Sequence, residues 1–481
     1  MKRNDAQMAL LQVKGSPFQG TGIKTRFNES ILVKLFALED KYRYVGNREI
    51  FEKYDELTGL WNGVDETKLV VQVLDFVLDT GAQEGVEGIG FAYNTSKAER
   101  LVRLLKSEVY VDKVQPCEQL FIHVRNGVLV FDKAKGYFVL QDFSPDFNSH
   151  NRIDIVYNKD AECPLFLEQL LDNMFPVKDC LHTFQQFVGQ CVLKNNISQT
   201  LAILSGDAEC GKSTTISIVE EILGKDNVAE LHTNRLEDKF EFVNYQYKSL
   251  LTAKDVPFDA LSANHVENLK KMTGGDLMTV ELKHSNKSFL CSGTFNILIS
   301  GNGHLPISLG NTRAAFERRG LSLPCKRKEG LVRDNGLKTK ILDNEKEGIL
   351  AWAIRGAEIL LNADGIMQQG SDQKTLNAML MDESEPVKTF IQEIVEENVS
   401  AKNGKGFVTS EDMIQKFYEF AVYKGWSNYP DRDKKVSRDI RKFMMILHPK
   451  CHHSTNCFAD ESTKKKCRGY LNCYLKPIEN E

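Results

Sequence analysis

Residues 206–214 read GDAECGKST, a match to the pattern G-x-x-x-x-G-K-[ST], and this motif constrains the fold more than any other feature. The apolar run QTLAILS before it predicts a buried strand, and TTISIVEEILG after it has helical spacing. Glycines let the backbone turn tightly, so that its N–H groups and the helix N-terminus face an anion. Strand and helix patterns alternate over the next 130 or so residues, as a parallel α/β sheet requires. The sequence therefore predicts a phosphate-binding loop in such a sheet.

The motif supplies candidate residues for a nucleoside triphosphate and its metal. Lys212 is expected to contact the β and γ phosphates, and the Ser213 hydroxyl is expected to coordinate Mg²⁺. The predicted cofactors are therefore ATP and Mg²⁺. The residues expected to bind the nucleotide are Gly206, Asp207, Ala208, Glu209, Cys210, Gly211, Lys212, Ser213 and Thr214.

A carboxylate at the end of a neighbouring strand is the second requirement of such a site, because it holds the hydrated metal and orients water. The segment KSLLTAKD is an apolar strand pattern that ends in Asp255, which makes Asp255 the candidate carboxylate for Mg²⁺. A surface aspartate at a strand end is the alternative. No second acid lies beside Asp255, and Asp259 has an awkward spacing, so the general base is unassigned.

Two further positions are candidates for catalysis. The buried-strand pattern FNILIS leads to Asn302, which would lie beside the γ phosphate as a sensor of hydrolysis if this strand neighbours the phosphate-loop strand. In isolation, an asparagine between glycines is ordinary turn chemistry. Arg313, Arg318 and Arg319 precede the pattern LSLP, and an arginine at a subunit boundary can stabilise charge on the neighbour's phosphoryl group. The pair Arg318 and Arg319 is the stronger candidate, although each could form a surface salt bridge.

A charged hairpin is predicted between the two strands that follow the phosphate loop. Short strand patterns flank a tip that presents Lys283, His284 and Lys287. In the channel of a ring, such a tip would hold a phosphate backbone without reading bases. The simpler alternative is an exposed charged hairpin.

The order of these motifs resembles superfamily 3 (AAA+) helicases, and within them the helicases of phage and plasmid replication proteins related to the poxvirus helicase-primase. The resemblance rests on GDAECGKST, SLLTAKD, LKKMTGGD, ELKHSNKSF, ILISGNGHLP and FERRGLSLP, and it covers about residues 40–362. The family's roles fall on Lys212, Ser213, Asp255 and Asn302, and on Arg318 or Arg319 in trans. The chain departs from the family at its second acidic strand, where KD stands in place of an acidic pair.

The resemblance implies an ATP-dependent, ring-forming DNA helicase that moves 3′ to 5′. It implies a homo-hexamer acting on single-stranded and forked DNA, with a separate primase or polymerase, in the cytoplasm of a bacterial host if a phage or plasmid encodes the chain. The main alternative is an AAA+ initiator or loader that melts DNA without processive unwinding. A nucleic-acid-binding scaffold with a decayed ATPase is a third possibility, and the intact motif residues argue against it.

The expected fold is an α/β P-loop AAA+ core with an N-terminal α+β domain and a C-terminal winged-helix-like domain, since three helical patterns precede strand patterns near the end. The expected parts are a flexible leader (1–28), an N-terminal helicase-associated α+β domain (29–162), a helical collar or bridge (163–198), the ATPase core (199–330), a C-terminal helical segment (331–385) and the winged-helix-like domain (386–481).

Composition argues against two classes of protein. No segment approaches the roughly 18 consecutive apolar residues that span a bilayer, and the first residues carry no secretory signal. A cytoplasmic protein without membrane contact is therefore expected. A net charge of −4 excludes a basic surface overall, so DNA contacts must come from local clusters. The candidates are CKRK at 325–328, DRDKKVSRDIRK at 431–442 and KKKCR at 464–468.

The C-terminal cysteines have a spacing that suggests two interpretations. Cys451, Cys457, Cys467 and Cys473 could hold a structural Zn²⁺ as four thiolates. Structural zinc sites usually contain closer cysteine pairs, so we expect thiols packed within a hairpin instead.

Overall fold

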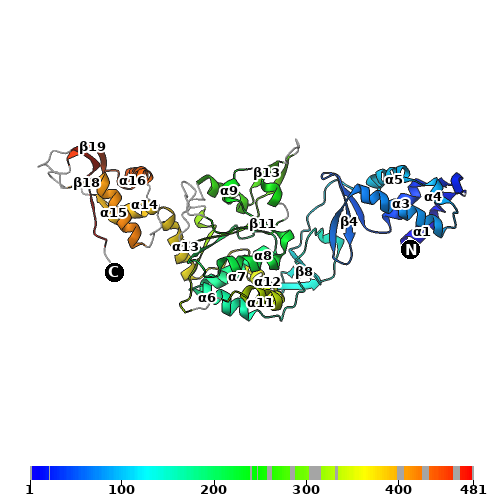
Figure 1. Ribbon diagram of the computed structural model, residues 1–481, viewed down its shortest axis with the longest axis horizontal. Coiled ribbons are helices and arrows are strands. Elements are labelled where there is room, and N and C mark those ends of the chain that lie inside the picture. Colours follow the sequence, from blue (N-terminus) through cyan, green and yellow to red (C-terminus); the bar gives the residue numbers. More distant parts are fainter. Residues whose placement is uncertain are drawn as a thin grey trace. The chain divides into compact units, whose positions relative to one another are not determined.

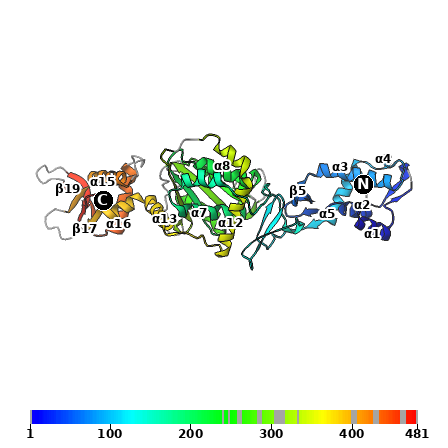
Figure 2. The same ribbon diagram turned by 90° about the horizontal axis from the view of Figure 1, so that it is seen from below.

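A computed structural model of the chain describes residues 3–20, 22–238, 241–245, 248–256, 263–281, 288–302, 316–330, 334–397, 406–424, 433–458 and 466–478. These residues form two units, Met1–Tyr157 and Asn158–Glu481 (Figures 1 and 2). Among the helices described, none is long and apolar enough to cross a membrane.

The first unit packs three amphipathic helices against a mixed sheet. Its helices are α1 (Asp5–Lys14), α2 (Glu29–Ala37), α3 (Glu66–Gln83), α4 (Ile89–Ala92) and α5 (Thr95–Glu108). Its strands are β1 (Phe18–Gln19), β2 (Arg26–Phe27), β3 (Tyr42–Val45), β4 (Ile50–Asp55), β5 (Leu60–Val64), β6 (Tyr110–Val111), β7 (Phe121–Val124), β8 (Gly127–Asp132) and β9 (Tyr137–Gln141). One sheet has the order β5-β4-β3-β6 and another β7-β8-β9, and the predicted turn at Asn126–Gly127 joins β7 to β8. Apolar residues of α2, α3 and α5 form the core with β3 and β4.

Within the segment that the sequence suggested as a flexible leader, residues Asp5–Lys14 form helix α1. Helix α1 begins at a capping box, in which the Asn4 side chain and the Gln7 side chain satisfy each other's backbone N–H groups. The Gln7 side chain is buried and donates to the Leu35 carbonyl oxygen at 3.0 Å. The pattern was missed because polar side chains at the cap, and not an apolar stripe, define this helix.

A buried cluster of charges joins β3 and β4. The Glu52 side chain has no exposed surface, and its carboxylate accepts hydrogen bonds from Arg43 Nε at 2.7 Å, Arg48 Nη2 at 2.7 Å and His150 Nε2 at 2.9 Å. The Arg43 guanidinium also stacks on the Trp61 ring, 3.8 Å from its centroid. Burial by itself would raise the pKa of Glu52, but the hydrogen bonds from His150 and Arg43 outweigh it and lower the pKa to about 2.

The second unit is built on a five-stranded parallel sheet, so the chain has a mixed α/β fold. Its strands are β10 (Leu201–Gly206), β11 (Val228–Glu230), β12 (Leu250–Ala253), β15 (Asn296–Asn302) and β16 (Gly320–Cys325), in the order β11-β12-β15-β10-β16. Its helical elements are the π-helix η3 (Leu165–Leu171), α6 (Asp172–Met174), α7 (Lys178–Val192), α8 (Lys212–Leu223), α9 (Ala263–Gly274), α11 (Leu337–Asn344), α12 (Lys346–Asn362) and α13 (Ser371–Ser384), with short 3-10 turns η4 (Lys225–Asn227), η5 (Thr233–Arg235) and η6 (Glu241–Tyr245).

Helices cover both faces of this sheet. Residues Leu201 and Ile203 of β10 and Ile297 and Ile299 of β15 pack in one core with α9. Figure 1 shows α7, α8 and α12 on the opposite side of the sheet from α9. Because both faces are covered, the central strands β10 and β15 carry runs of consecutive buried apolar residues, as parallel strands between helices usually do.

The C-terminal part contains the three helices that the sequence predicts, but two short strands lie between the first helix and the second, where the sequence predicted helices in direct succession. The helices are α14 (Pro386–Ile394), α15 (Ser410–Tyr423) and α16 (Asp433–Leu447), and the strands are β17 (Val395–Glu397), β18 (Phe407–Thr409), β19 (His452–Phe458), β20 (Lys466–Leu471) and β21 (Cys473–Leu475). Antiparallel β19 and β20 form a hairpin, with β18 on the other side of β20. Side chains of all three helices and of β20 share one apolar core.

Candidate functional site

The predicted phosphate loop, residues 206–214 and called the phosphate loop below, connects the end of β10 to the start of α8, as the motif requires. Gly206 has a φ of +136°, and a Cβ there would lie 1.9 Å from the Cys325 carbonyl oxygen. Gly211 has a φ of +108° and caps α8, whose first residue is Lys212. These two glycines are therefore needed because the backbone adopts positive φ at both and approaches β16 closely at the first.

Lys212 lies inside this loop. Its side chain is only 4% exposed, and its ammonium group donates to the Gly206 carbonyl oxygen at 3.1 Å and to the Asp207 carbonyl oxygen. The same nitrogen lies 3.6 Å from the Cys210 sulfur. The loop thus holds a buried cation at the N-terminus of α8, where the helix dipole also favours an anion.

A pair of thiols at the phosphate loop is a feature that the sequence motif did not reveal. Cys210 lines the loop and Cys325 ends β16, and their thiol groups form a hydrogen bond. This hydrogen bond, together with the charge of Lys212, lowers the pKa of Cys210 to about 6 although burial opposes the change. Cys325 and the ammonium group of Lys212 therefore favour the charged form of the cysteine within the motif.

Asp255 lies at the same cavity as the phosphate loop. It follows β12 with a φ of +51°, its side chain is exposed, and its backbone N–H donates to Ser300 Oγ at 3.4 Å. The cavity has a volume of about 590 Å³, and its wall includes Asp255, Lys212 and Ser213. This volume falls within the range typical of small-molecule sites. The fold thus brings together the motif and the carboxylate that the sequence proposed as a pair.

Asn302 occupies the expected strand position. It ends β15, which lies between β10 and β12, and it is in register with Gly206 at the start of the phosphate loop. The sequence analysis required the strand of Asn302 to neighbour the strand of the phosphate loop. The pairing of β15 with β10 confirms this. The side chain of Asn302 lies outside the described residues, so its role as a sensor stays a prediction.

Two cations reach the phosphate-loop cavity from segments for which sequence reasoning gave no nucleotide role. Arg327 follows β16, and Lys338 lies in the first turn of α11. The Arg327 Nη1 atom lies 3.2 Å from Glu209 Oε2, and its backbone N–H donates to Asp207 Oδ2 at 3.0 Å. The sequence placed Arg327 in a basic cluster that could bind DNA. The parallel pairing of β16 with β10 is what places it beside the phosphate loop.

Arg318 and Arg319 lie near the amino end of β16, at the end of the sheet opposite to the phosphate loop. Gly320, which follows them directly, is in register with Leu201, the first residue of β10. The phosphate loop begins five residues after Leu201, at Gly206. With a rise of about 3.3 Å per residue along a strand, these two positions are roughly 17 Å apart. Arg318 is exposed, whereas Arg319 is partly buried next to the charge of Asp276. Arg318 is therefore accessible to another molecule, at the end of β16 that is remote from its own phosphate loop.

The two strands of the predicted charged hairpin are present. Strands β13 (Leu277–Glu281) and β14 (Ser288–Ser292) pair antiparallel, which confirms the two strand patterns. Lys283, His284 and Lys287 belong to the tip, which lies outside the described residues, as do Arg313 and Asp259. Their proposed contacts with DNA and with the nucleotide stay predictions.

Two of the C-terminal cysteines, Cys451 and Cys473, pack within the core of the three helices. Cys473 is fully buried and Cys451 is 7% exposed, and burial raises the pKa of both thiols. In the described part of the chain, no cluster of three or more histidine, cysteine or acidic residues has a geometry that could hold a metal ion. The side chain of Cys457 lies outside that part, so the four-cysteine zinc site is untested.

Comparison with known proteins gives a family match and a structural likeness. A family described as "Family of unknown function (DUF5906)" matches residues 204–319, which contain the phosphate loop, β12 and β15. No curated protein sequence matches the chain. Among solved structures, the apo structure of the NrS-1 C-terminal region has a TM-score of 0.50 at 13% identity, covering 92% of this chain and 98% of that chain.

Two other solved structures are less similar. The A form apo structure of the NrS-1 C-terminal region has a TM-score of 0.47 at 12% identity, over 92% of this chain and 98% of that one. The X-ray structure of JCV helicase has a TM-score of 0.22 at 15% identity, over 42% of this chain and 60% of that one. The likeness to the apo structure of the NrS-1 C-terminal region, at a TM-score of 0.50, supports a shared α/β fold along most of the chain.

Proposed function

We propose that this chain is an ATP-dependent DNA helicase of the superfamily 3 type, with a P-loop AAA+ core that hydrolyses ATP within a ring of identical subunits. The observation that carries the proposal is the cavity at the carboxyl end of β10, because one wall presents Lys212 and Ser213 and another presents Asp255. Ligand sites of open parallel sheets lie at the carboxyl ends of the strands, so this position suits a nucleotide.

The side chains at the cavity suit ATP and Mg²⁺. Lys212 would exchange its backbone carbonyl partners for the β and γ phosphates, which are stronger acceptors because they are charged. The Ser213 hydroxyl and the Asp255 carboxylate are hard oxygen donors of the kind that Mg²⁺ prefers. Arg327 and Lys338 add positive charge at the cavity and would neutralise the triphosphate further. Asn302, at the end of the intervening strand, would sense the γ phosphate.

The position of Arg318 supports a ring. An exposed arginine that is roughly a strand length from its own phosphate loop can act only on nucleotide bound by a neighbouring subunit. Hydrolysis would then require assembly, as it does where an arginine is supplied in trans. We take Arg318, rather than Arg319, as the trans arginine, since Asp276 and partial burial hold Arg319 within its own subunit.

DNA would pass through the ring. The hairpin of β13 and β14 would carry Lys283, His284 and Lys287 into the channel, where they would contact phosphates of single-stranded DNA. The three C-terminal helices with the β19–β20 hairpin suit a winged-helix-like domain. A homo-hexamer with 3′ to 5′ movement and a separate primase or polymerase complete the proposal. An initiator or loader that uses the same ATPase without unwinding is the second candidate.

Replacing Lys212 by alanine tests whether the cavity is the ATPase site. We expect DNA-stimulated ATP hydrolysis to fall by roughly 100- to 1,000-fold, because a preorganised cation at the developing phosphoryl charge is lost. Phosphate release in the presence of single-stranded DNA measures this. Lys225→Ala is the matched control, because Lys225 is an exposed lysine just beyond the other end of α8 and should leave the rate unchanged. Equal rates for wild type and Lys212→Ala would exclude this cavity as the site.

A further inference from the structure

A second pocket lies in the first unit and does not involve the phosphate loop. It has a volume of about 260 Å³ and lies between α2, α3, β3 and the start of the chain. Aromatic rings form part of its wall: Phe36 stacks on Tyr42 at 5.2 Å and meets Phe76 edge-on at 5.2 Å. The pocket therefore offers flat π surfaces, whose faces attract cations.

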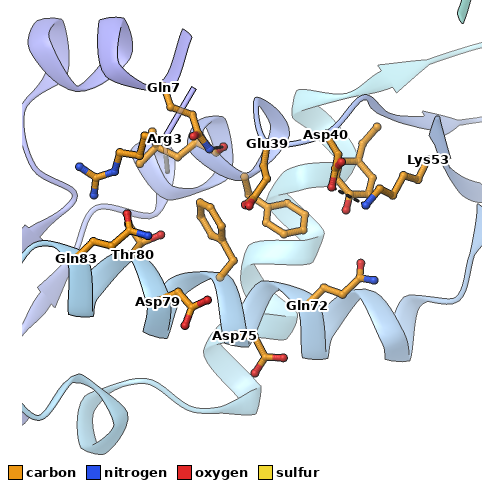
Figure 3. A pocket seen from close by; sticks show the side chains of 14 residues that line it. Arg3, Gln7, Glu39, Asp40, Lys53, Gln72, Asp75, Asp79, Thr80 and Gln83 are labelled. Atoms are coloured by element: carbon orange, nitrogen blue, oxygen red, sulfur yellow. Dashed lines mark hydrogen bonds and ion pairs between the residues drawn. The ribbon is translucent and has the colours of Figure 1, made fainter. Parts of the chain in front are cut away.

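Carboxylates outnumber cations around these rings. Lys53 is paired with Asp40 at 2.5 Å, and Arg3 is paired with Glu84 at 2.8 Å. Figure 3 shows that the remaining carboxylates come from two sides, Asp75 and Asp79 from α3 and Glu39 from the segment across the pocket. None of these three carboxylates forms an ion pair or a hydrogen bond with another residue in the described ranges. The residues that line the pocket thus carry an excess of negative charge.

The arrangement is unfavourable for the protein alone. Asp75 and Asp79 are four residues apart on α3, so two like charges lie on the same face of one helix. Burial and the neighbouring Asp40 raise the pKa of Glu39, and the charge of Lys53 offsets them only in part. A cation in the pocket would relieve both effects.

Thr80 gives a second and independent indication of a ligand. It is 5% exposed and lines the pocket, and its hydroxyl has no hydrogen-bond partner among the residues that the structure describes. Hydroxyl groups of buried residues are nearly always hydrogen-bonded, so the expected partner is water or a ligand within the pocket. Figure 3 places Thr80 beside Asp79 on the same helix, where one bound group could reach both.

The placement of the acidic and aromatic side chains favours one kind of cation, a guanidinium group, over a metal ion. The described residues contain no set of three or more carboxylate, histidine or cysteine groups able to hold a metal ion, so the acids are too dispersed for Mg²⁺ or Ca²⁺. A guanidinium group is planar, stacks on aromatic rings and carries five N–H donors in a fixed arrangement. DNA is excluded, because its phosphates would face unpaired carboxylates.

Apolar side chains near the pocket indicate that the guanidinium belongs to a polypeptide. Met8, Leu38 and Val71 are 46%, 39% and 53% exposed, and each directly adjoins in sequence a residue that lines the pocket. Interfaces of proteins commonly combine an arginine anchored in a pocket with surrounding apolar contacts. We propose that this pocket binds the side chain of an arginine on a partner polypeptide, between the aromatic rings and the carboxylates of Glu39, Asp75 and Asp79.

Saturation-transfer NMR on the full chain tests the proposal with the peptide acetyl-Leu-Arg-Leu-amide. We expect saturable binding, with a Kd on the order of millimolar for so small a ligand. The double variant Asp75→Asn/Asp79→Asn should weaken binding at least tenfold. The matched control is Glu99→Gln/Glu108→Gln, which removes two exposed carboxylates from α5 outside the pocket. It should bind as the wild type does.

Two further ligands separate the contribution of the guanidinium charge from that of the apolar flanking residues. A peptide with citrulline in place of arginine keeps the shape but lacks the charge, and it should not bind measurably. Equal weakening in the two double variants, or equal binding of the citrulline peptide, would overturn the proposal. So would binding of N-acetyl-arginine amide as tight as that of the peptide, because the apolar flanks would then contribute nothing. Nucleotide is absent from these experiments, so their outcome is independent of the ATPase.

Discussion

Replacing Arg318 by alanine is expected to lower ATP hydrolysis by roughly 1,000-fold or more, the effect of removing an arginine supplied in trans. Arg318 is exposed and precedes β16 at the edge of the sheet opposite the phosphate loop. It therefore contributes nothing to nucleotide binding in its own subunit, and the Kd for ATP measured on isolated subunits should stay unchanged. Steady-state phosphate release and equilibrium binding of a fluorescent ATP analogue separate the two effects.

Mixing of inactive variants tests whether the arginine acts between subunits. Arg318→Ala retains an intact phosphate loop, and Lys212→Ala retains the arginine, so mixed rings contain some complete sites. We expect the mixture to hydrolyse ATP faster than either variant alone. Arg235→Ala is the control, because Arg235 is an exposed arginine elsewhere in the same core and should leave the rate unaltered. A mixture as inactive as its parts would mean that Arg318 does not act in trans.

Replacing Glu52 by glutamine is expected to destabilise the first unit by about 3 kcal/mol at neutral pH. The ordinary pKa of 4.5 falls to about 2 in the folded state, and each unit between them corresponds to about 1.4 kcal/mol. The substitution also leaves Arg43 buried without a charged partner. Hydrogen exchange of peptides from β3, β4 and β5 in the full chain, followed against urea concentration, measures the stability of this unit.

The pH dependence of this stabilisation has a definite sign. Because the pKa of Glu52 is lowered on folding, its contribution is fully present above about pH 4.5 and is lost as the pH falls towards 2. Glu52→Gln should lack this part of the pH dependence. Glu56→Gln is the control, since Glu56 forms an exposed ion pair with Lys41 at 3.3 Å, and such pairs contribute at most about 1 kcal/mol. Equal losses in the two variants would contradict the role given to Glu52.

Local sequence patterns predicted the parts of the site that lie next to each other in the chain. The motif at 206–214 was found between a strand and a helix because both neighbours carry clear periodicity. The β13–β14 hairpin and the final three helices followed from the same kind of pattern. Asp255 and Asn302 were found because each follows an apolar strand, and the carboxyl ends of parallel strands share one edge of a sheet.

Contacts between distant segments could not be predicted in this way. Arg327 looked like one of several surface cations until the pairing of β16 with β10 placed it beside Glu209. The hydrogen bond between the thiols of Cys210 and Cys325 depends on the same pairing. The pocket between α2 and α3 depends on how two amphipathic helices pack, and periodicity shows only which face of each helix is buried.

The central claim is that this chain couples ATP hydrolysis to separation of DNA strands, and unwinding of forked DNA tests it most directly. The measurement compares 3′-tailed and 5′-tailed forks with wild type and with Lys212→Ala. We predict ATP-dependent unwinding of the 3′-tailed fork by the wild type and none by the variant. DNA-stimulated hydrolysis by the wild type without separation of either fork would contradict the claim and would favour an initiator or loader.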